Sequence, residues 1–429
     1  MPKSDRTVTN SDPTPLNPEK DPPSKTKPLL SRTFQALYYR DYRLLWFGAF
    51  TSTTGTWMQQ VAESWVVFTL TGSAFYLGLT SFLGQLPIIL FTLVGGVIAD
   101  RADRRKVLII SQYVQMATAL TLTILIYFEW IQIWHFLVLV FVVGMAQAFG
   151  APAYQALIPN LVKKEDLPNA IALNSIQFNL ARVFGPMLAG TVLALVGPTM
   201  CFGLNGLSFV AVIVSLYLIR GTFQPKKTDE SVMTGIREGM TFVRERAAIW
   251  QLSALGFVIT FCGVPILTLL PIYAREIFHM ETTGYSVMMT VSGIGSVVGA
   301  LTYASLGNIK GRGKLTLQVQ FVMALMIATF ALSRNLVLSC IALFLCGICL
   351  MILIASISSL VQMAITEEIR GRVMSIFMLA FRGGMPLGSL SGGALASQLS
   401  PTLALLSMSL LLGVTALVLF ASHSPIKKL

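Results

Sequence analysis

Long apolar stretches recur along almost the whole chain and leave few folds open to it. Each stretch of about 18–25 residues is long enough to cross a bilayer core of about 30 Å as a helix. Only 12% of the residues are charged, whereas about 25% is usual for a soluble domain. The stretches do not alternate with a period of two, which argues against the strands of a membrane barrel. The sequence therefore predicts an all-α membrane protein with twelve transmembrane helices.

The positive charges gather on one side of this topology. The formal net charge is +12, and most Lys and Arg residues fall in the N-terminal segment and the even-numbered loops. Cytoplasmic loops carry such an excess. We therefore expect a multi-pass protein of the inner (plasma) membrane with both termini in the cytoplasm. Because topology explains the charge, no nucleic-acid partner is expected.

The apolar stretches divide into two similar halves. Arg182-Val-Phe-Gly-Pro186 in the fifth stretch is echoed by Arg382-Gly-Gly-Met-Pro386 in the eleventh. Many transporters consist of two such halves with the substrate site between them. The predicted organisation is a disordered cytoplasmic tail (1–31), a first six-helix bundle (32–219), a cytoplasmic connector with an amphipathic helix (220–250), a second six-helix bundle (251–422) and a cytoplasmic tail (423–429).

Three ionisable residues, Glu63, Arg182 and Arg382, lie deep within predicted helices. A charge at membrane depth marks a candidate functional site. We predict that Glu63 and Arg182 face one central cavity and couple transport to proton movement. The alternative is a structural ion pair between helices. For Arg382, anion binding, conformational coupling and structural pairing are open.

Polar residues on the same two helices extend this candidate cavity. Helical spacing places Glu63 on one face with neighbours three, four and seven residues earlier, and Arg182 on one face with Asn179. A polar face on a membrane helix is expected to point to a water-filled cavity or to other helices. The predicted cavity-lining residues are Thr56, Gln59, Gln60, Asn179 and Arg382.

A charged loop between the second and third helices is the most specific motif. Gly96 is expected to let helices approach closely, and Asp100 to act as an acceptor at a helix N-terminus. Arg104 and Arg105 are expected to pair with acidic groups in one conformation only. The predicted gating motif is Gly96, Asp100, Arg101, Arg104 and Arg105; the alternative is an ordinary positive loop.

The fifth helix carries a proline flanked by small residues. Pro186 removes a backbone hydrogen bond, and Gly185 and Gly190 allow tight contact with a neighbour. We expect a kink here, with ordinary helix packing as the alternative. The spacing of Cys346 and Cys349 matches a redox motif, but buried packing is the expected role. No metal site and no cofactor are predicted.

These motifs together resemble the major facilitator superfamily over about residues 35–422. The charged loop is similar to motif A, with Asp103 in place of a glycine, and Gly185, Pro186 and Gly190 are similar to motif C of proton-coupled antiporters. A narrower set resembles the branch of the enterobactin exporter and related drug efflux proteins: Gly55-Thr-Trp-Met-Gln59, Leu70-Thr-Gly-Ser73, Pro152-Ala-Tyr-Gln-Ala156, Pro159, Leu167-Pro-Asn-Ala170 and Ala172-Leu-Asn174. Glu63 departs from that branch, in which an uncharged residue is expected.

The resemblance implies two pseudo-symmetric six-helix bundles and a proton-coupled secondary transporter. We expect export of small amphipathic molecules, siderophores or drugs, by alternating access in a monomer within the lipid bilayer. An importer, a uniporter or a lysolipid flippase of the same fold is the first alternative. A membrane sensor or scaffold that does not transport is the second. No Ser-His-Asp set or phosphate-binding loop supports an enzyme.

Overall fold

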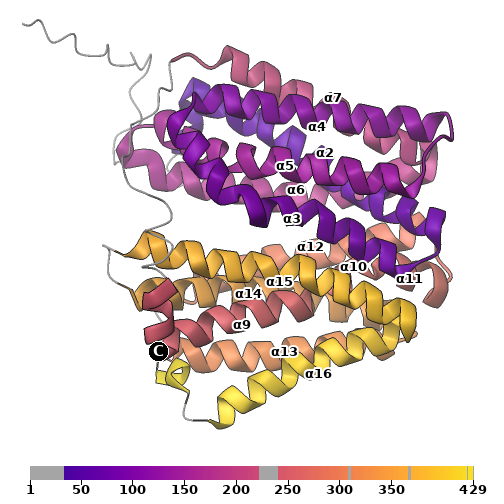
Figure 1. Ribbon diagram of the computed structural model, residues 1–429, viewed down its shortest axis with the longest axis vertical. Helices are drawn as coiled ribbons and strands as arrows, with labels where there is room; N and C mark the ends of the chain where they lie inside the picture. The colour runs from indigo at the N-terminus through magenta and orange to yellow at the C-terminus, as the bar shows by residue number, and fades with distance from the viewer. Residues whose placement is uncertain (1–32, 222–239, 308–310, 366–368, 423, 429) are drawn as a thin grey trace, which may run out of the picture.

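The computed structural model shows two bundles of long helices, one from each half of the chain (Figure 1). The bundles lie side by side with their helices running in a common direction. The connector is described only over 220–221 and 240–250, where residues 240–245 are helical. The tail over 1–31 and the rest of the connector, with the first part of its predicted amphipathic helix, fall outside the described residues. These are 33–221, 240–307, 311–365, 369–422 and 424–428.

The first bundle consists of six helices joined by short connections. Three short 3-10 segments, η1 (Gln35–Tyr38), η2 (Ile158–Asn160) and η3 (Lys164–Asp166), lie at its loop ends. The six helices are α2 (Arg40–Thr71), α3 (Ala74–Arg101), α4 (Arg104–Tyr127), α5 (Ile133–Leu157), α6 (Leu167–Val196) and α7 (Pro198–Leu218).

The second bundle begins with a broken helix. Pro265 and Pro271 interrupt it, because proline cannot donate the helical hydrogen bond. The pieces are α9 (Ala247–Gly263), α10 (Pro265–Thr268), α11 (Leu270–Ile272) and the π-helix η4 (Tyr273–Ile277). The remaining elements are α12 (Thr282–Ser305), α13 (Arg312–Leu332), α14 (Leu336–Met363), α15 (Arg370–Gln398), α16 (Pro401–Ala421) and the short η5 (Pro425–Lys428).

Within the described residues, 11 helical segments are long and apolar enough to cross a membrane. The first long helix, α2, is not among them, although it packs between α6 and α7 within the first bundle. Its Thr, Gln and Glu residues lower its hydropathy. The all-helical membrane fold is thus confirmed, while the count of twelve transmembrane helices remains a prediction.

The two bundles repeat one packing scheme. The main contacts in the first bundle, such as α3 with α5 and α4 with α7, have counterparts in the second, α12 with α14 and α13 with α16. The predicted pseudo-symmetry is therefore confirmed. The echoed arginines differ in register: Arg182 lies 15 residues after the start of α6, and Arg382 lies 12 after the start of α15. A difference of three residues is about one helical turn.

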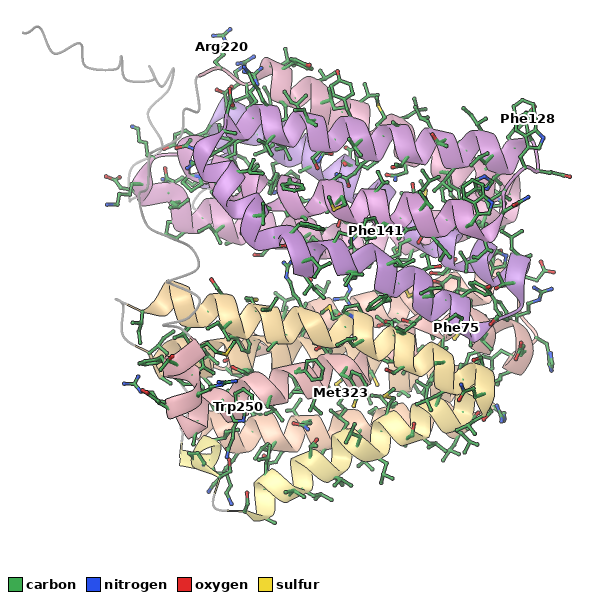
Figure 2. The ribbon with its side chains drawn as sticks, in the orientation of Figure 1. Phe75, Phe128, Phe141, Arg220, Trp250 and Met323 are labelled. Carbon is green, nitrogen blue, oxygen red and sulfur yellow. The ribbon has the colours of Figure 1, made fainter. Side chains whose placement is uncertain are left out.

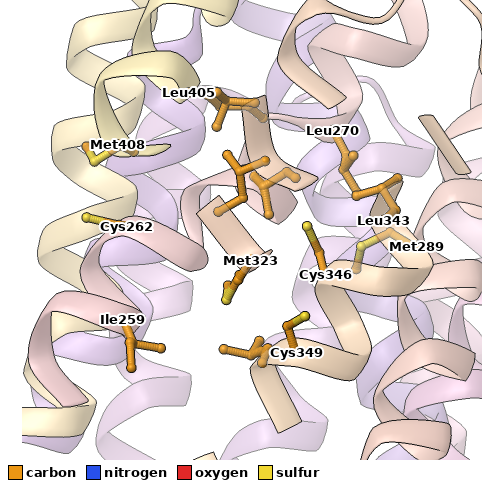
Figure 3. Close-up of a cluster of buried hydrophobic side chains, with 14 of the residues drawn as sticks. Ile259, Cys262, Leu270, Met289, Met323, Leu343, Cys346, Cys349, Leu405 and Met408 are labelled. Atoms are coloured by element: carbon orange, nitrogen blue, oxygen red, sulfur yellow. The ribbon is translucent and has the colours of Figure 1, made fainter. Parts of the chain in front are cut away.

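The core of the second bundle contains several sulfur-bearing side chains. Cys346 and Cys349 of α14 lie near Met289 of α12 and Met323 of α13 (Figure 3). Both cysteines are free and buried, which confirms the expected packing role.

Polar contacts fasten the start of α2 to the start of α6. The Tyr39 hydroxyl donates to Asp166 Oδ2 at 2.6 Å, and the Tyr42 hydroxyl donates to the Ala170 carbonyl at 2.7 Å. Asn169 Oδ1 accepts from the Ala36 amide at 2.9 Å. Asn169 and Ala170 belong to the segment that resembles the efflux branch, so part of that signature serves to join helix ends.

Breaking the Tyr39–Asp166 contact should lower stability below about pH 10 and should have less effect at higher pH. Burial, and then the hydrogen bond to Asp166, raise the pKa of Tyr39 above its usual value. A raised folded-state pKa contributes stability that is present below about pH 10 and is lost as pH rises further. In detergent, we expect Tyr39→Phe to melt earlier than the native chain at pH 8 and to lose less of its melting temperature between pH 9 and 11.

The neighbouring Tyr38, whose side chain is 58% exposed, gives the matched control Tyr38→Phe. This variant should follow the native alkaline profile. Equal slopes for the native chain and Tyr39→Phe would contradict the role assigned to the contact.

Candidate functional site

The two bundles meet along two pairs of helices. α6 packs on α12, and α3 packs on α15. Gly190 lies against Ser286 in the first pair, and Gly78 lies against Gly393 in the second. Phe75, one turn before Gly78, lies toward the end of the molecule opposite Arg220 (Figure 2). These two close contacts therefore join the bundles at the end away from the connector.

Three of the four polar residues expected on one face of α2 remain at its surface. Thr56 and Glu63 are half-buried, and Gln60 is exposed. Gln59 instead turns into the first bundle, where its Oε1 accepts a hydrogen bond of 2.6 Å from Asn205 Nδ2 of α7. A buried amide needs such a partner, so the structure gives Gln59 a helix-joining contact rather than a place on an open surface.

Arg182 is half-buried and lies over an aromatic ring. Its Cζ is 5.6 Å from the centre of the Trp57 ring, a cation–π arrangement. Phe178 of the same helix also packs on the Trp57 ring, with ring centres 6.0 Å apart in an edge-on geometry. The structure does not show the ion pair that was considered between Arg182 and Glu63. Among the described residues, the salt bridge found within 4.0 Å is Arg40–Asp41. Trp57 is the functional candidate that the sequence reasoning did not single out.

Asn179 lies one turn before Arg182. Its Nδ2 donates to the Ser175 carbonyl at 2.8 Å. Its Oδ1 is buried and, within the described part of the chain, has no hydrogen-bond partner. An unpaired amide oxygen next to an arginine can accept a hydrogen bond from a ligand or from water.

Arg382 is exposed and belongs to the α15 face that looks toward the first bundle. Ser389 and Gly393, seven and eleven residues later, share its face by helical spacing. Both pack against Gly78 of α3. Arg382 thus lies on the face of α15 that is turned toward the first bundle. It is closer to the connector end of the molecule than the contact of Ser389 and Gly393 with Gly78.

The proline of α6 leaves one backbone carbonyl without its helical hydrogen bond at the point where α12 approaches. Pro186 lies inside the helix, so the Arg182 carbonyl loses its usual donor. Gly293 of α12 faces that carbonyl, and a Cβ built on Gly293 would lie 3.1 Å from its oxygen. Gly185 faces the other neighbour: a Cβ there would lie 2.9 Å from the Thr54 carbonyl of α2. The predicted small-residue motif is therefore a packing site on two sides.

The glycine of the charged loop does not have the role expected for it. A Cβ built on Gly96 would meet no described atom within 4 Å. The preceding Gly95 makes the close approach instead, to the Ala148 carbonyl of α5. Consecutive residues of a helix point in directions about 100° apart. The sequence pattern alone did not tell which of the two glycines faces α5. The side chains of Asp100 and Arg101 lie outside the described part.

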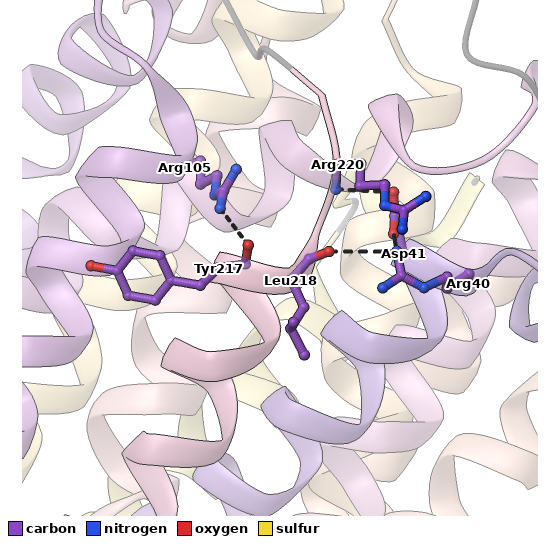
Figure 4. Close-up of polar contacts among 6 residues, drawn as sticks. All are labelled: Arg40, Asp41, Arg105, Tyr217, Leu218 and Arg220. Atoms are coloured by element: carbon purple, nitrogen blue, oxygen red, sulfur yellow. Dashed lines mark hydrogen bonds and ion pairs between the residues drawn. The ribbon is translucent and has the colours of Figure 1, made fainter.

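The rest of the loop binds helix ends. Asp103 caps α4, and its Oδ1 accepts from the Arg105 amide at 3.0 Å, as expected of an N-cap aspartate. Arg104 donates to the Ala156 carbonyl at 3.1 Å, and Arg105 donates to the Tyr217 carbonyl at 2.8 Å. Figure 4 shows the Arg105 contact. Contacts of this kind with helix C-termini are favourable because those ends carry partial negative charge. The expected pairing with carboxylates is therefore replaced, in these contacts, by carbonyl oxygens.

The second bundle repeats one of these contacts. Arg312, the first residue of α13, donates to the Ser359 hydroxyl of α14 at 2.9 Å. A cavity of about 560 Å³ lies beside Ser359 at the end of α14. Its lining mixes hydroxyl, amide and apolar groups: Ala355, Ser358, Ser359, Gln362, Met363 and Ile365.

Comparison with known families agrees with this architecture. The sequence matches the family model MFS_3, described as transmembrane secretion effector, over residues 31–428. The chain belongs to this family. It is a multi-pass membrane transporter of the major facilitator type, and the resemblance inferred from its motifs is confirmed.

Similar proteins include exporters. The multidrug efflux pump Tap of Mycolicibacterium fortuitum is 28% identical over 88% of this chain and 95% of its own. The enterobactin exporter EntS of Citrobacter koseri is 26% identical over 81% of this chain and 79% of its own.

The fold also matches a solved structure. A bacterial homologue of the human lysosomal transporter Spinster, in an inward-facing and occupied conformation, has a TM-score of 0.73 and 12% identity. The match covers 91% of this chain and 98% of that one. At this identity, the likeness shows the fold.

Gly185→Ala should weaken the contact between α2 and α6. The added methyl group would meet the Trp57 side chain and the Thr54 carbonyl, and overpacking of this kind typically destabilises by about 1–3 kcal/mol. We expect a lower melting temperature in detergent. Gly96→Ala is the matched control, because its methyl group meets open space and gains up to about 1 kcal/mol of helix propensity. Equal stability of the two variants would contradict this packing.

Proposed function

We propose that the chain is a proton-coupled exporter of small amphipathic molecules, of the siderophore or drug class. The observation that carries the proposal is Glu63, an acid at membrane depth that no described cation neutralises within 4.0 Å. Such an acid is a candidate proton carrier. The similarity to a siderophore exporter and to a multidrug pump supports the substrate class and the direction.

Alternating access would use the two bundles as moving parts. The contacts Gly190–Ser286 and Gly78–Gly393 hold them together at one end. Opening that end requires these contacts to separate, while the connector end closes. In this proposal the cavity beside Ser359 is part of the route by which substrate enters from the connector side.

The charged loop would act as a gate element of the first bundle. Arg104 and Arg105 join the ends of α4, α5 and α7, so that these helices can move as one body. The charge distribution supports the placement of both termini in the cytoplasm. A monomer in the inner membrane suffices, because one chain supplies both bundles.

Arg182 and Arg382 would bind the polar part of the substrate. Arg182 lies on α6 and Arg382 lies on α15, and each of these helices packs against a helix of the other bundle. Arg182, with Trp57 beneath it, offers a charged group and an aromatic surface together. An amphipathic molecule has a polar part that could bind the charged group and an apolar part that could bind the aromatic surface.

Glu63→Gln tests the proton coupling. In cells producing the full chain, ethidium efflux energised by glucose should fall at least tenfold in this variant, because glutamine keeps the size of the side chain but carries no exchangeable charge. A protonophore should abolish efflux by the native chain. Ethidium accumulation is followed by fluorescence, and membrane abundance is matched by immunoblot.

Glu129→Gln is the control, since Glu129 is an exposed acid in a turn outside the long helices. It should leave efflux unchanged. Native-like, protonophore-sensitive efflux by Glu63→Gln would refute Glu63 as the carrier. Efflux that persists with the protonophore would indicate a uniporter, and a native chain that moves no tested compound would favour the sensor or scaffold alternative.

A further inference from the structure

The last described residues of the chain are docked against the second bundle. The C-terminal segment (residues 424–428), which includes η5, packs on α9 and α13. The Ser424 hydroxyl donates to Gln251 Oε1 near the start of α9 at 2.7 Å, and the surface of Ile426 is 0% exposed. Figure 1 shows this end of the chain beside α9. Ser424 and Ile426 therefore anchor the C-terminal segment to the bundle.

The docked segment packs directly on the beginning of α13. A Cβ built on Gly313, the second residue of that helix, would overlap the Ile426 carbonyl and lie 3.1 Å from Cγ2 of the Ile426 side chain. The N-cap residue of α13 is Gly311, so no side chain caps this helix. A helix without a side-chain cap lacks one of the contacts that fix its first turn. The packing of Ile426 against Gly313 supplies a contact at that place.

Arg312, the residue before Gly313, reaches the cavity at the end of α14. Its guanidinium donates to the Ser359 hydroxyl at 2.9 Å and to the Gly307 carbonyl at 2.6 Å. Ser358 and Ser359 both line the cavity. The charge of Arg312 thus lies at the edge of the cavity, and its place depends on the helical turn that the C-terminal segment covers.

We propose that the C-terminal segment positions Arg312 at the edge of the cavity beside Ser359. By packing on Gly313, Ile426 fixes the first turn of α13 and with it the direction of the Arg312 side chain. The cavity thereby keeps a positive charge at its edge, which favours the approach of anionic groups over cationic ones. This inference rests on the proposed function for its role in transport, because the cavity is proposed there as part of the substrate route.

The charge at the cavity is measured with a cysteine placed in its lining. Ser358→Cys in the purified full chain, in an uncharged detergent, is reacted with two methanethiosulfonate reagents, one carrying a sulfonate and the other a trimethylammonium group. The ratio of the two rates reports the local charge. The chain without this cysteine gives the background from the native cysteines, four of which are buried.

Arg312→Gln calibrates this ratio. We expect the ratio of the anionic to the cationic rate to fall about fivefold, the effect of one unit charge at about 8 Å in water on two oppositely charged reagents. The difference from the Ser358→Cys chain should shrink in about 1 M salt, where the Debye length is about 3 Å.

The double variant Ser424→Ala, Ile426→Ala removes both anchors without changing any charge. It should lower the ratio at least about threefold, since Arg312 would no longer be held at the cavity. It should have no further effect in the Arg312→Gln background, because residues that act through one another are not additive. The matched control is Val418→Ala, Ser422→Ala at the end of α16, where Val418 is 58% exposed and Ser422 is also exposed. It should leave the ratio unchanged.

An unchanged ratio in the double variant, or a further fall in the Arg312→Gln background, overturns the role of the C-terminal segment. An unchanged ratio in Arg312→Gln itself overturns it as well. If the double variant does not melt cooperatively, Gly313→Ala replaces it, because the added methyl group displaces the Ile426 carbonyl; Gly383→Ala, whose methyl group would meet no described atom within 4 Å, is then the control. The rate ratio needs no transport, so a positive result stands even where Glu63→Gln leaves efflux intact and the proton-coupling proposal fails.

Discussion

The backbone polar groups of this protein must find partners within an apolar interior, and the packing of its helices follows from that constraint. No water satisfies a carbonyl in the hydrocarbon core, yet Pro152, Pro186 and Pro265 each remove a helical donor. The carbonyls four residues earlier belong to Ala148, Arg182 and Phe261. In each case a glycine of a neighbouring helix faces the freed oxygen: Gly95, Gly293 and Gly388. Proline and glycine therefore act as pairs across helix boundaries, where weak Cα–H···O contacts recur.

The same constraint orders the helix ends. The last carbonyls of α5 and α7 receive guanidinium groups from Arg104 and Arg105, and the first amides of α4 receive the Asp103 carboxylate. Arg40 adds a contact with the Leu218 carbonyl of α7 (Figure 4). Charges that must stay out of hydrocarbon thus stabilise the ends of the helices that cross it. These contacts join the helix ends of the first bundle to one another.

Some residues of the candidate site could be predicted from the sequence, and others are known only from the structure. Glu63, Arg182 and Arg382 stand out because charges at membrane depth are rare. Their surroundings do not stand out: Trp57 beneath Arg182 is one aromatic residue among many. Gln59 has the spacing of a cavity residue, but Asn205 of α7 holds it inside the bundle. Helical spacing places a residue on a face without telling which neighbour that face meets.

The sequence by itself determined the helical membrane fold, the two-fold repeat and the family. Apolar length, charge placement and local motifs are properties of neighbouring residues along the chain, so no tertiary contact is needed to recognise them. The tertiary structure adds that Gly95 rather than Gly96 makes the close approach, that arginines bind carbonyls, and that Tyr285 of the second bundle stacks on Trp65 of the first. These depend on helix rotation and on the docking of segments more than 200 residues apart, where a shift of one residue turns a side chain by about 100°.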